Sequence, residues 1–315
     1  MTVAAPAVGR GIELRLEPPA EALVFMGADR PLERIAVTEV LLREGEALVA
    51  VELATVCGSD VHTAVGHRRA PAPLVLGHEQ VGRIVAFGPG ARARAIDGSA
   101  LSVGDRVVWG VALDCGKCRL CRRGHRNKCE RIAKFGHERL RRGWELSGGL
   151  ATHVHLPART SIVRVGDDLP AAVLAPASCA TATVAAALDA AETLRPLADE
   201  IVVVSGCGML GLTAIAMASR ACARVIGVDP DPTRRALAGR FGARAVAEPG
   251  VAAIRTAVDR VARRNERVDG FGVALELSGA NDAITDILAA AGIGATIVLA
   301  GSVFTAPPVP LSAES

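Results

Sequence analysis

Four cysteines lie within fifteen residues of this chain, at a spacing typical of a metal site. Thiolates are soft ligands, and four of them fill the tetrahedral coordination shell of Zn²⁺ and leave no position open for a substrate. An iron–sulfur cluster or two disulfides would use the same residue type, but the spacing favours zinc. We therefore expect a structural zinc in a lobe spanning residues 112–132, bound by Cys115, Cys118, Cys121 and Cys129.

A second set of potential zinc ligands is spread over three parts of the chain. Cys57 and His78 are expected on loops beside apolar strands, and Cys179 lies in a stretch rich in Ala and Thr. Three protein ligands and one open position are the arrangement of a catalytic zinc. Each residue also has a purely structural explanation, with Cys179 as a small buried side chain and His78 as a hydrogen-bonded loop histidine.

A glycine fingerprint indicates a nucleotide site. Gly206, Gly208 and Gly211 lie between a predicted strand, Ile201–Ser205, and a predicted helix, Met209–Arg220. In this context the glycines permit a tight turn, a close approach of the pyrophosphate and close packing of the helix. The N-terminus of the helix then offers N–H groups and the positive end of its dipole to the phosphates.

An acidic residue specifies which dinucleotide is expected. Asp229 ends a second predicted strand, Arg224–Val228, and lies 18 residues after Gly211. A carboxylate in this position can bind the ribose 2′-hydroxyl and repels a 2′-phosphate, so NAD is favoured over NADP. The residues expected to bind the cofactor are Gly206, Gly208, Met209, Leu210, Gly211 and Asp229.

Two different patterns along the chain predict the elements that carry these residues. From Ala22 to about Val165, short apolar runs separated by Gly and Pro predict a β-rich domain with long loops. From Ile201 onward, predicted strands and helices alternate, with further strands expected at Gly270–Leu277 and Ala295–Ala300. Such alternation implies a parallel sheet covered by helices on both faces, and a length of 315 residues suggests two domains.

The composition excludes several classes of protein. A formal net charge of +3 argues against a general binder of nucleic acid or other polyanions. The chain contains no tyrosine, which excludes hydride-transfer enzymes that protonate through a Tyr–Lys pair. The two long uncharged windows, Leu169–Leu188 and Ile201–Ser219, are interrupted by Pro or Gly, so we expect buried segments and no membrane span. Met1–Pro19 lacks the continuous apolar core of a secretory signal, and with metal-spaced thiols this indicates a cytoplasmic protein.

Together these motifs resemble the zinc-containing medium-chain alcohol dehydrogenases, from Ala22 to about Pro310. The stretch Gly77-His78-Glu79-x2-Gly82-x5-Gly88-x2-Ala91 is similar to the zinc signature of that family, and the cysteine quartet and glycine fingerprint follow in the family's order. The resemblance implies a β-rich GroES-like catalytic domain over residues 1–178 and a doubly wound Rossmann NAD-binding domain over residues 179–315. A narrower likeness, to alcohol dehydrogenase-like proteins associated with phosphonate metabolism, rests on residues 134–138, 176–183 and 208–212.

The resemblance also assigns ligands to a catalytic zinc, which would be the second zinc of each chain. It implies that Cys57, His78 and Cys179 bind this zinc and that Glu79 is a nearby carboxylate that can exchange into the coordination shell. Some relatives use a glutamate shortly before the third ligand position, but Ala175 stands there in this chain, so Cys179 is the better candidate.

The same resemblance implies a proton path. Asp60 would orient His78 through a hydrogen bond. Ser59 would accept the proton of the substrate hydroxyl, and His62 would relay it toward solvent because histidine titrates near neutral pH. The implied activity is a reversible hydride transfer between a small alcohol and NAD, which yields an aldehyde or ketone.

The oligomeric state, the function class and the substrate are each left open by the sequence. The chain ends at Ser315, whereas the family usually continues, so we expect an unpaired edge at Ala295–Ala300 and weakened dimerisation of any homo-oligomer. A non-catalytic paralogue that binds zinc and NAD is the alternative function, and a zinc-ribbon binder of nucleic acid is the least favoured.

The side chains do not identify the alcohol, although arginines of the basic lobe, Arg139, Arg141 and Arg142, would steer an anionic substrate.

Overall fold

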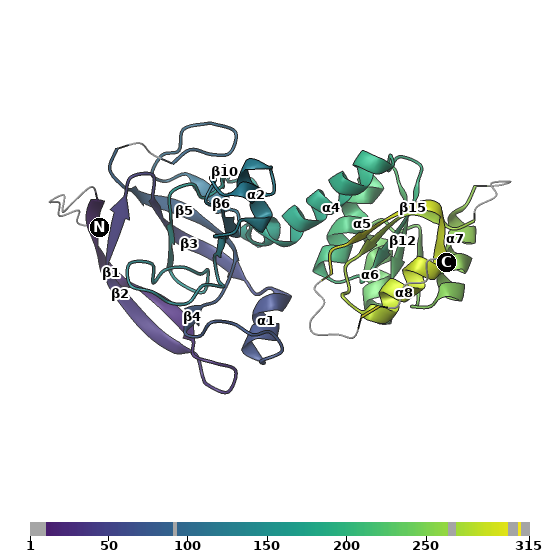
Figure 1. Cartoon of the computed structure of the whole chain (residues 1–315), viewed down its shortest axis with the longest axis horizontal. Helices are drawn as coiled ribbons and strands as arrows, with labels where there is room; N and C mark the ends of the chain where they lie inside the picture. The colour runs from purple at the N-terminus through teal and green to yellow at the C-terminus, as the bar shows by residue number, and fades with distance from the viewer. Residues whose placement is uncertain (1–10, 91–92, 264–268, 302–307, 310–315) are drawn as a thin grey trace. The chain divides into compact units, whose positions relative to one another are not determined.

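The computed structural model describes residues 11–90, 93–263, 269–301 and 308–309. The chain divides into two compact units, Met1–Cys179 and Ala180–Ser315, which Figure 1 shows as a strand-rich half and a half in which helices flank a sheet. Ala91, the last residue of the zinc signature, lies outside the described residues.

Antiparallel sheets form the first unit. A five-stranded sheet has the order β10-β6-β5-β3-β9, a three-stranded sheet has the order β2-β1-β4, and β7 pairs with β8. The strands are β1 (Gly11–Phe25), β2 (Glu33–Arg43), β3 (Ala47–Thr55), β4 (Leu74–Val75), β5 (Glu79–Phe87), β6 (Arg106–Trp109), β7 (Ala112–Leu113), β8 (Ala133–Lys134), β9 (His153–Leu156) and β10 (Ile162–Arg164). The helical segments are α1 (Gly58–Ala64), α2 (Arg119–Arg122), α3 (Ala171–Leu174) and two 3₁₀ turns, η1 (Arg126–Lys128) and η2 (Ala175–Ser178).

Strand β3 lies between two apolar cores of this unit because successive side chains of a strand point to opposite faces. Leu48 packs with Leu14 and Leu42 in one core, and Val49 packs with Ile84 and Trp109 in the other. The strand is also hydrogen-bonded to β5 on one side and β9 on the other. Burial on both faces holds β3 firmly, and the loop that carries Cys57 begins at its end.

A hydrogen-bonded contact between a carboxylate and a buried imidazole fixes the other end of β3. Glu46, in the turn between β2 and β3, accepts a hydrogen bond from the backbone N–H of Arg43, and its Oε2 lies 2.9 Å from Nε2 of His155 in β9. Burial alone would raise the pKa of Glu46, but the contacts with His155 and Arg43 outweigh it and lower the pKa below 4.5. The pair therefore ties the β2–β3 turn to β9 while Glu46 is ionised.

The second unit contains one parallel sheet with the order β13-β12-β11-β14-β15. Its strands are β11 (Ile201–Ser205), β12 (Arg224–Val228), β13 (Ala245–Ala247), β14 (Phe271–Glu276) and β15 (Ala291–Leu299). Its helices are α4 (Ala180–Leu194), α5 (Met209–Arg220), α6 (Pro232–Arg240), α7 (Val251–Val261) and α8 (Asn281–Ala290). The predicted strands 201–205 and 224–228 and the predicted helix 209–220 have the expected bounds, whereas β13 was not anticipated because only three apolar residues mark it.

Helices cover both faces of this sheet, as the alternation of strands and helices indicates. Val202 and Val204 of β11 pack with residues of α4, α5 and α6, whereas Ile201 and Val203 pack with residues of α7 and α8. All five residues of β11 are buried, which explains its continuous apolar sequence.

Strand β15 stands at one edge of the sheet, and its hydrogen-bonded neighbour in the described part of the chain is β14. It begins at Ala291, earlier than the predicted start at Ala295, because the pairing with β14 already starts opposite Phe271 and then shifts register before Val273. The predicted edge position is thus observed for the described residues.

Within the described residues, no single helix has the length and apolar character needed to cross a membrane. Two consecutive helical segments, Ala171–Ser178 and Ala180–Leu194, reach that length and composition only when they are taken together.

The variant Glu46→Gln tests the role of the Glu46–His155 contact. Because the pKa of Glu46 is lower in the folded state, its contribution is complete above 4.5 and is lost as the pH falls through the folded pKa. We expect a loss of about 1 kcal/mol in the free energy of unfolding at pH 7, measured by chemical denaturation. The loss should shrink below pH 4.5. The exposed neighbour Glu44→Gln is the control and should unfold like the wild type at both pH values.

Candidate functional site

Asp60 joins two loops of the first unit. It is the third residue of α1, and its Oδ2 accepts a hydrogen bond of 3.0 Å from the N–H of Cys57, which precedes the helix. Its Oδ1 accepts a hydrogen bond of 3.2 Å from the N–H of Gly77 and lies 3.4 Å from Nδ1 of His78. Asp60 is buried, with 5% of its surface exposed. One carboxylate therefore holds the Cys57 and His78 segments beside each other.

Gly77 is required by the path of the chain before His78. Its φ is +93°, a left-handed conformation that favours glycine, and a Cβ here would lie 2.7 Å from the backbone nitrogen of Leu150. This tight turn ends β4 and places His78 immediately before β5, of which Glu79 is the first residue.

Four side chains of the first unit offer metal-binding atoms within 4.8 Å of one another: Cys57, His78, Glu79 and Cys179. Cys57 Sγ and Cys179 Sγ are 4.0 Å apart although 122 residues separate them in sequence. Because Asp60 contacts Nδ1 of His78, the Nε2 atom is the one left to bind a ligand. Glu79 accepts a hydrogen bond of 2.8 Å from the hydroxyl of Thr55.

The electrostatics of this cluster favour one thiolate. The hydrogen bond from Cys179 lowers the pKa of Cys57, and it raises the pKa of Cys179. Burial would lower the pKa of His78, but its contacts with Asp60 and Cys57 outweigh burial and raise it to about 9. Burial raises the pKa of Glu79. Such opposed shifts in one cluster are typical of a functional site.

Ser59 and His62 lie on α1, three residues apart, and so share one face of the helix. Ser59 Oγ is 3.3 Å from Nε2 of His78, which places the hydroxyl at the nitrogen that would bind a metal. The ring of His62 lies 5.7 Å from that of His67, which is exposed. The structure therefore brings Ser59 to the cluster and places His62 one helical turn farther along.

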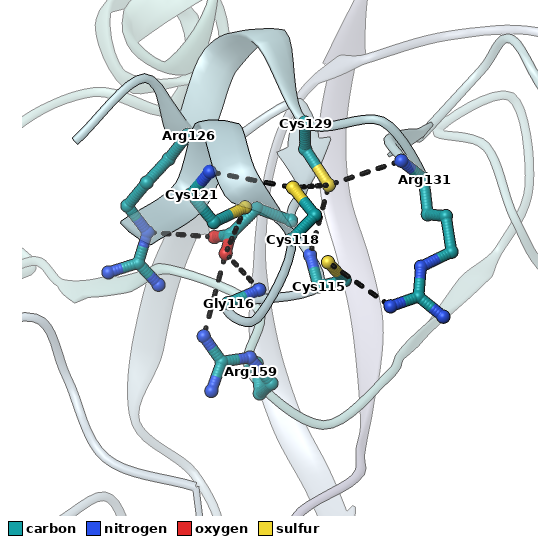
Figure 2. Close-up of polar contacts among 9 residues, drawn as sticks. Cys115, Gly116, Cys118, Cys121, Arg126, Cys129, Arg131 and Arg159 are labelled. Atoms are coloured by element: carbon teal, nitrogen blue, oxygen red, sulfur yellow. Dashed lines mark hydrogen bonds and ion pairs between the residues drawn. The ribbon is translucent and has the colours of Figure 1, made fainter. Parts of the chain in front are cut away.

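The cysteine quartet forms a second cluster, in which the metal-binding atoms of Cys115, Cys118, Cys121 and Cys129 also lie within 4.8 Å of one another. Figure 2 shows the four sulfur atoms converging between α2 and the flanking loops. Backbone N–H groups point at the sulfurs, since Cys121 donates to Cys118 Sγ at 3.4 Å and Cys115 donates to Cys129 Sγ at 3.3 Å. Such donors stabilise thiolates.

Arg126, Arg131 and Arg159 lie around the quartet (Figure 2), and Asp114 contacts it as well. Asp114 accepts hydrogen bonds from Arg126 and Gly116 and lies 3.7 Å from Cys121 Sγ. Arg131 donates to Cys115 Sγ at 3.8 Å through its guanidinium. These contacts brace the lobe around the four sulfurs.

The three fingerprint glycines of the second unit have distinct environments. Gly206 has φ of +88°, and a Cβ would lie 2.8 Å from the backbone nitrogen of Ser278. Gly211 packs so closely that a Cβ would overlap the carbonyl oxygen of Gly206. Gly208, at the N-cap of α5, has open space where a Cβ would stand. These environments match a tight turn, close helix packing and an open approach to the N-terminus of α5.

A cavity of about 420 Å³ opens beside this turn and is lined by Gly206, Gly208 and Asp229. Asp229 is almost fully buried and accepts hydrogen bonds from the N–H groups of Cys207 and Asp231. Arg234 also lines the cavity, and its Nη1 lies 3.9 Å from Asp229 Oδ2.

Sequence reasoning missed part of this cavity. Its lining does not include the side chains of Met209 and Leu210, and Leu210 packs instead against the core beside α5. The lining does include the loop after β14 and the start of α8, with Ser278, Asp282 and Asp286 among its residues. The rule that ligands bind at the carboxyl ends of parallel strands would have indicated this loop.

The three arginines expected to steer an anionic substrate lie in the segment that follows β8. Arg139, Arg141 and Arg142 are exposed, and Arg141 stacks over the ring of Trp144 at 4.6 Å.

Comparisons with known proteins agree with both units. The family model described as the alcohol dehydrogenase GroES-like domain matches residues 43–167, and the model described as zinc-binding dehydrogenase matches residues 210–314. The chain is 31% identical over 286 residues to an L-threonine 3-dehydrogenase of Anaeromyxobacter dehalogenans, covering 88% of this chain and 73% of that protein.

Solved structures show the same fold. An alcohol dehydrogenase from Thermotoga maritima superposes with a TM-score of 0.82 at 29% identity and covers 93% of this chain and 80% of its own. A zinc-binding dehydrogenase from Sinorhizobium meliloti, solved with NADP, superposes with a TM-score of 0.79 at 25% identity, with 93% and 80% covered. The predicted GroES-like and Rossmann fold class is thus confirmed, while the likeness to the phosphonate-associated subgroup stays a prediction.

The two family models together match most of the chain, including the cysteine quartet, and the threonine dehydrogenase match covers 88% of it. This chain belongs to the zinc-containing medium-chain alcohol dehydrogenase family, whose members are oxidoreductases that use zinc and a nicotinamide cofactor to interconvert alcohols and carbonyl compounds.

Proposed function

We propose that this chain oxidises a small alcohol with NAD at a zinc held by Cys57, His78 and Cys179. The observation that carries the proposal is the convergence of these side chains and Glu79 within 4.8 Å. The first unit would be the catalytic domain, and the second unit, with its glycine turn and cavity, would be the NAD-binding domain.

The donor atoms suit zinc at both clusters. Tetrahedral zinc–thiolate bonds of about 2.3 Å separate two ligand sulfurs by roughly 3.8 Å. The Cys57–Cys179 distance is 4.0 Å and the Cys118–Cys129 distance is 3.9 Å. We therefore propose two zincs per chain, a structural zinc on the quartet and a catalytic zinc on Cys57, His78 and Cys179, with Glu79 able to exchange into its shell.

Bound zinc polarises an alcohol oxygen and lowers the pKa of the hydroxyl, and bound NAD accepts the hydride. The chain's own residues supply orientation and a route for the proton. Asp60 Oδ1 lies 3.4 Å from Nδ1 of His78, which leaves Nε2 as the nitrogen available to the cluster. Ser59, whose hydroxyl is 3.3 Å from that Nε2, would take the substrate proton, and His62 would pass it on.

The charge around the nucleotide cavity supports NAD rather than NADP. Three carboxylates line the cavity, those of Asp229, Asp282 and Asp286, against the single guanidinium of Arg234. Arg234 contacts Asp229 and Asp231, so part of its charge is already compensated. A 2′-phosphate beside the buried Asp229 would meet like charge.

The substrate is proposed only as a class. The relative from Anaeromyxobacter dehalogenans is named for the oxidation of L-threonine, which is a secondary alcohol, so L-threonine and simple secondary alcohols are the first substrates to test.

Purified protein should contain two zincs and produce NADH with at least one such alcohol. The variant Cys179→Ala should keep the zinc of the quartet and lose the other, and kcat should fall by roughly 1000-fold or more. The variant Cys118→Ser should lose the structural zinc and unfold at a lower temperature, with Cys57, His78 and Cys179 intact. The measurements are metal analysis, thermal melting and NADH absorbance.

Cys222, an exposed cysteine outside both clusters, provides the control, since Cys222→Ser should retain both zincs and full activity. A wild-type protein that binds two zincs and NAD but turns over no alcohol or aldehyde would contradict the proposed catalysis and favour the non-catalytic alternative.

The cofactor preference depends on Asp229. We expect Asp229→Asn to lower the ratio of kcat/KM for NAD to kcat/KM for NADP by roughly 10- to 100-fold, because the repulsion of a 2′-phosphate is removed. Initial rates with each cofactor measure the ratio. Asp259→Asn is the control, since Asp259 is exposed on α7 and does not line the cavity. An unchanged ratio in Asp229→Asn would refute the role of Asp229.

A further inference from the structure

Arg68 lies in the loop that follows α1, close to the proposed catalytic zinc site. Its backbone N–H donates a hydrogen bond of 2.9 Å to the carbonyl of His62, so the loop folds back along the helix. Its guanidinium Nη1 lies 2.8 Å from Nε2 of His137, a residue 69 positions away that follows β8. The side chain is half-buried, which limits the directions it can take.

The contact with His137 orients the guanidinium without neutralising it. Nδ1 of His137 is 2.8 Å from the carbonyl oxygen of Phe135, which can only accept, so Nδ1 carries the hydrogen. Nε2 of the neutral ring is then an acceptor and receives an N–H of Arg68. The imidazole therefore fixes one end of the guanidinium fork and adds no negative charge.

The guanidinium of Arg68 has no ion-pair partner among the described residues. Within the described ranges, no carboxylate lies at ion-pair distance from Arg68, whereas Arg83, Arg106 and Arg126 each pair with one. A guanidinium has five N–H donors, and the contact with His137 uses one of its ends. A half-buried guanidinium with free donors is suited to bidentate binding of a carboxylate or phosphate.

The guanidinium is also near the proposed zinc ligands. The ring of His137 that holds it lies 4.8 Å, centroid to centroid, from the ring of His78. One imidazole therefore separates the guanidinium from His78. An anionic group bound to Arg68 would be a few bonds away from a hydroxyl group held at the cluster of Cys57, His78 and Cys179.

We propose that Arg68, positioned by His137, binds the oxyanion of an alcohol substrate that carries a carboxylate or phosphate a few bonds from its hydroxyl. The inference rests on the proposed function, since it assigns a substrate class to the same site. Arg139, Arg141 and Arg142, which were expected to steer an anionic substrate, are exposed, whereas Arg68 is half-buried and held by His137.

The alternative reading is that Arg68 only braces His137. A bracing residue affects every substrate alike, because loss of its contact would disturb His78 whatever the alcohol carries. A residue that binds the substrate oxyanion affects anionic alcohols and leaves their neutral counterparts nearly unchanged. Paired substrates therefore separate the two readings.

The test compares wild type with Arg68→Met and Arg68→Lys, and uses the exposed neighbour Arg69→Met as the matched control. The carboxylate pair is 3-hydroxybutyrate and its methyl ester, and the phosphate pair is 2-hydroxypropyl phosphate and 1,2-propanediol.

For an anionic substrate we expect Arg68→Met to lower kcat/KM by roughly 10- to 100-fold, mainly through KM, with a smaller loss in Arg68→Lys. The neutral partner should change less than about 3-fold, and Arg69→Met should behave as wild type. The pair that shows the loss identifies carboxylate or phosphate as the group bound.

Equal losses for anionic and neutral substrates, or no loss in Arg68→Met, would overturn the inference while leaving the dehydrogenase activity established. A binding measurement covers the case in which no alcohol is turned over. Titration calorimetry of the zinc-loaded protein with butyrate and with propyl phosphate should give a dissociation constant at least about 10-fold higher in Arg68→Met than in wild type for one of them. Equal constants in the two proteins for both anions would overturn the inference, and absence of turnover alone would overturn the proposed function.

Discussion

A buried carboxylate is the constraint on which the proposed zinc site depends. Burying a charge is costly unless it is paired and hydrogen-bonded, and Asp60 meets this requirement with two backbone N–H groups and a contact to an imidazole. The two N–H groups belong to Cys57 and Gly77, so satisfying one charge brings together the loops that carry Cys57 and His78. The same contact turns Nε2 of His78 toward the other donors, and α1, which begins after Cys57, sets the place of Ser59.

Much of this arrangement could be predicted from sequence because its signals are local. The cysteine quartet lies within fifteen residues, and the glycine turn lies between an apolar strand and a helix that both form as expected. The spacing of such motifs reflects geometry within one turn or loop. Cys179 is different, because its residue type alone left a purely structural role open and the family resemblance favoured a ligand role; its sulfur lies 4.0 Å from that of Cys57.

The features that sequence did not predict depend on contacts between distant segments. Arg68 meets His137 across 69 residues, and Glu46 meets His155 across 109 residues. Neither pair has a recognisable spacing, because the positions are set by how loops pack on β-sheets. The loop after β14 lines the nucleotide cavity for the same reason, since the order of strands in the sheet brings β14 beside β11. Strand β13 was not predicted from the sequence, because a run of three small apolar residues is too short to show the alternation of a strand.

The central claim is that Asp60 organises Cys57, His78 and Cys179 into a zinc site, and zinc affinity in Asp60→Asn measures it directly. Titration of zinc-loaded protein with a chelator should release two zincs in separate steps. The account predicts that Asp60→Asn weakens one of the two by roughly 10- to 100-fold and leaves the zinc of the cysteine quartet unchanged. Equal affinity in the variant and the wild type, or equal weakening of both zincs, would contradict it.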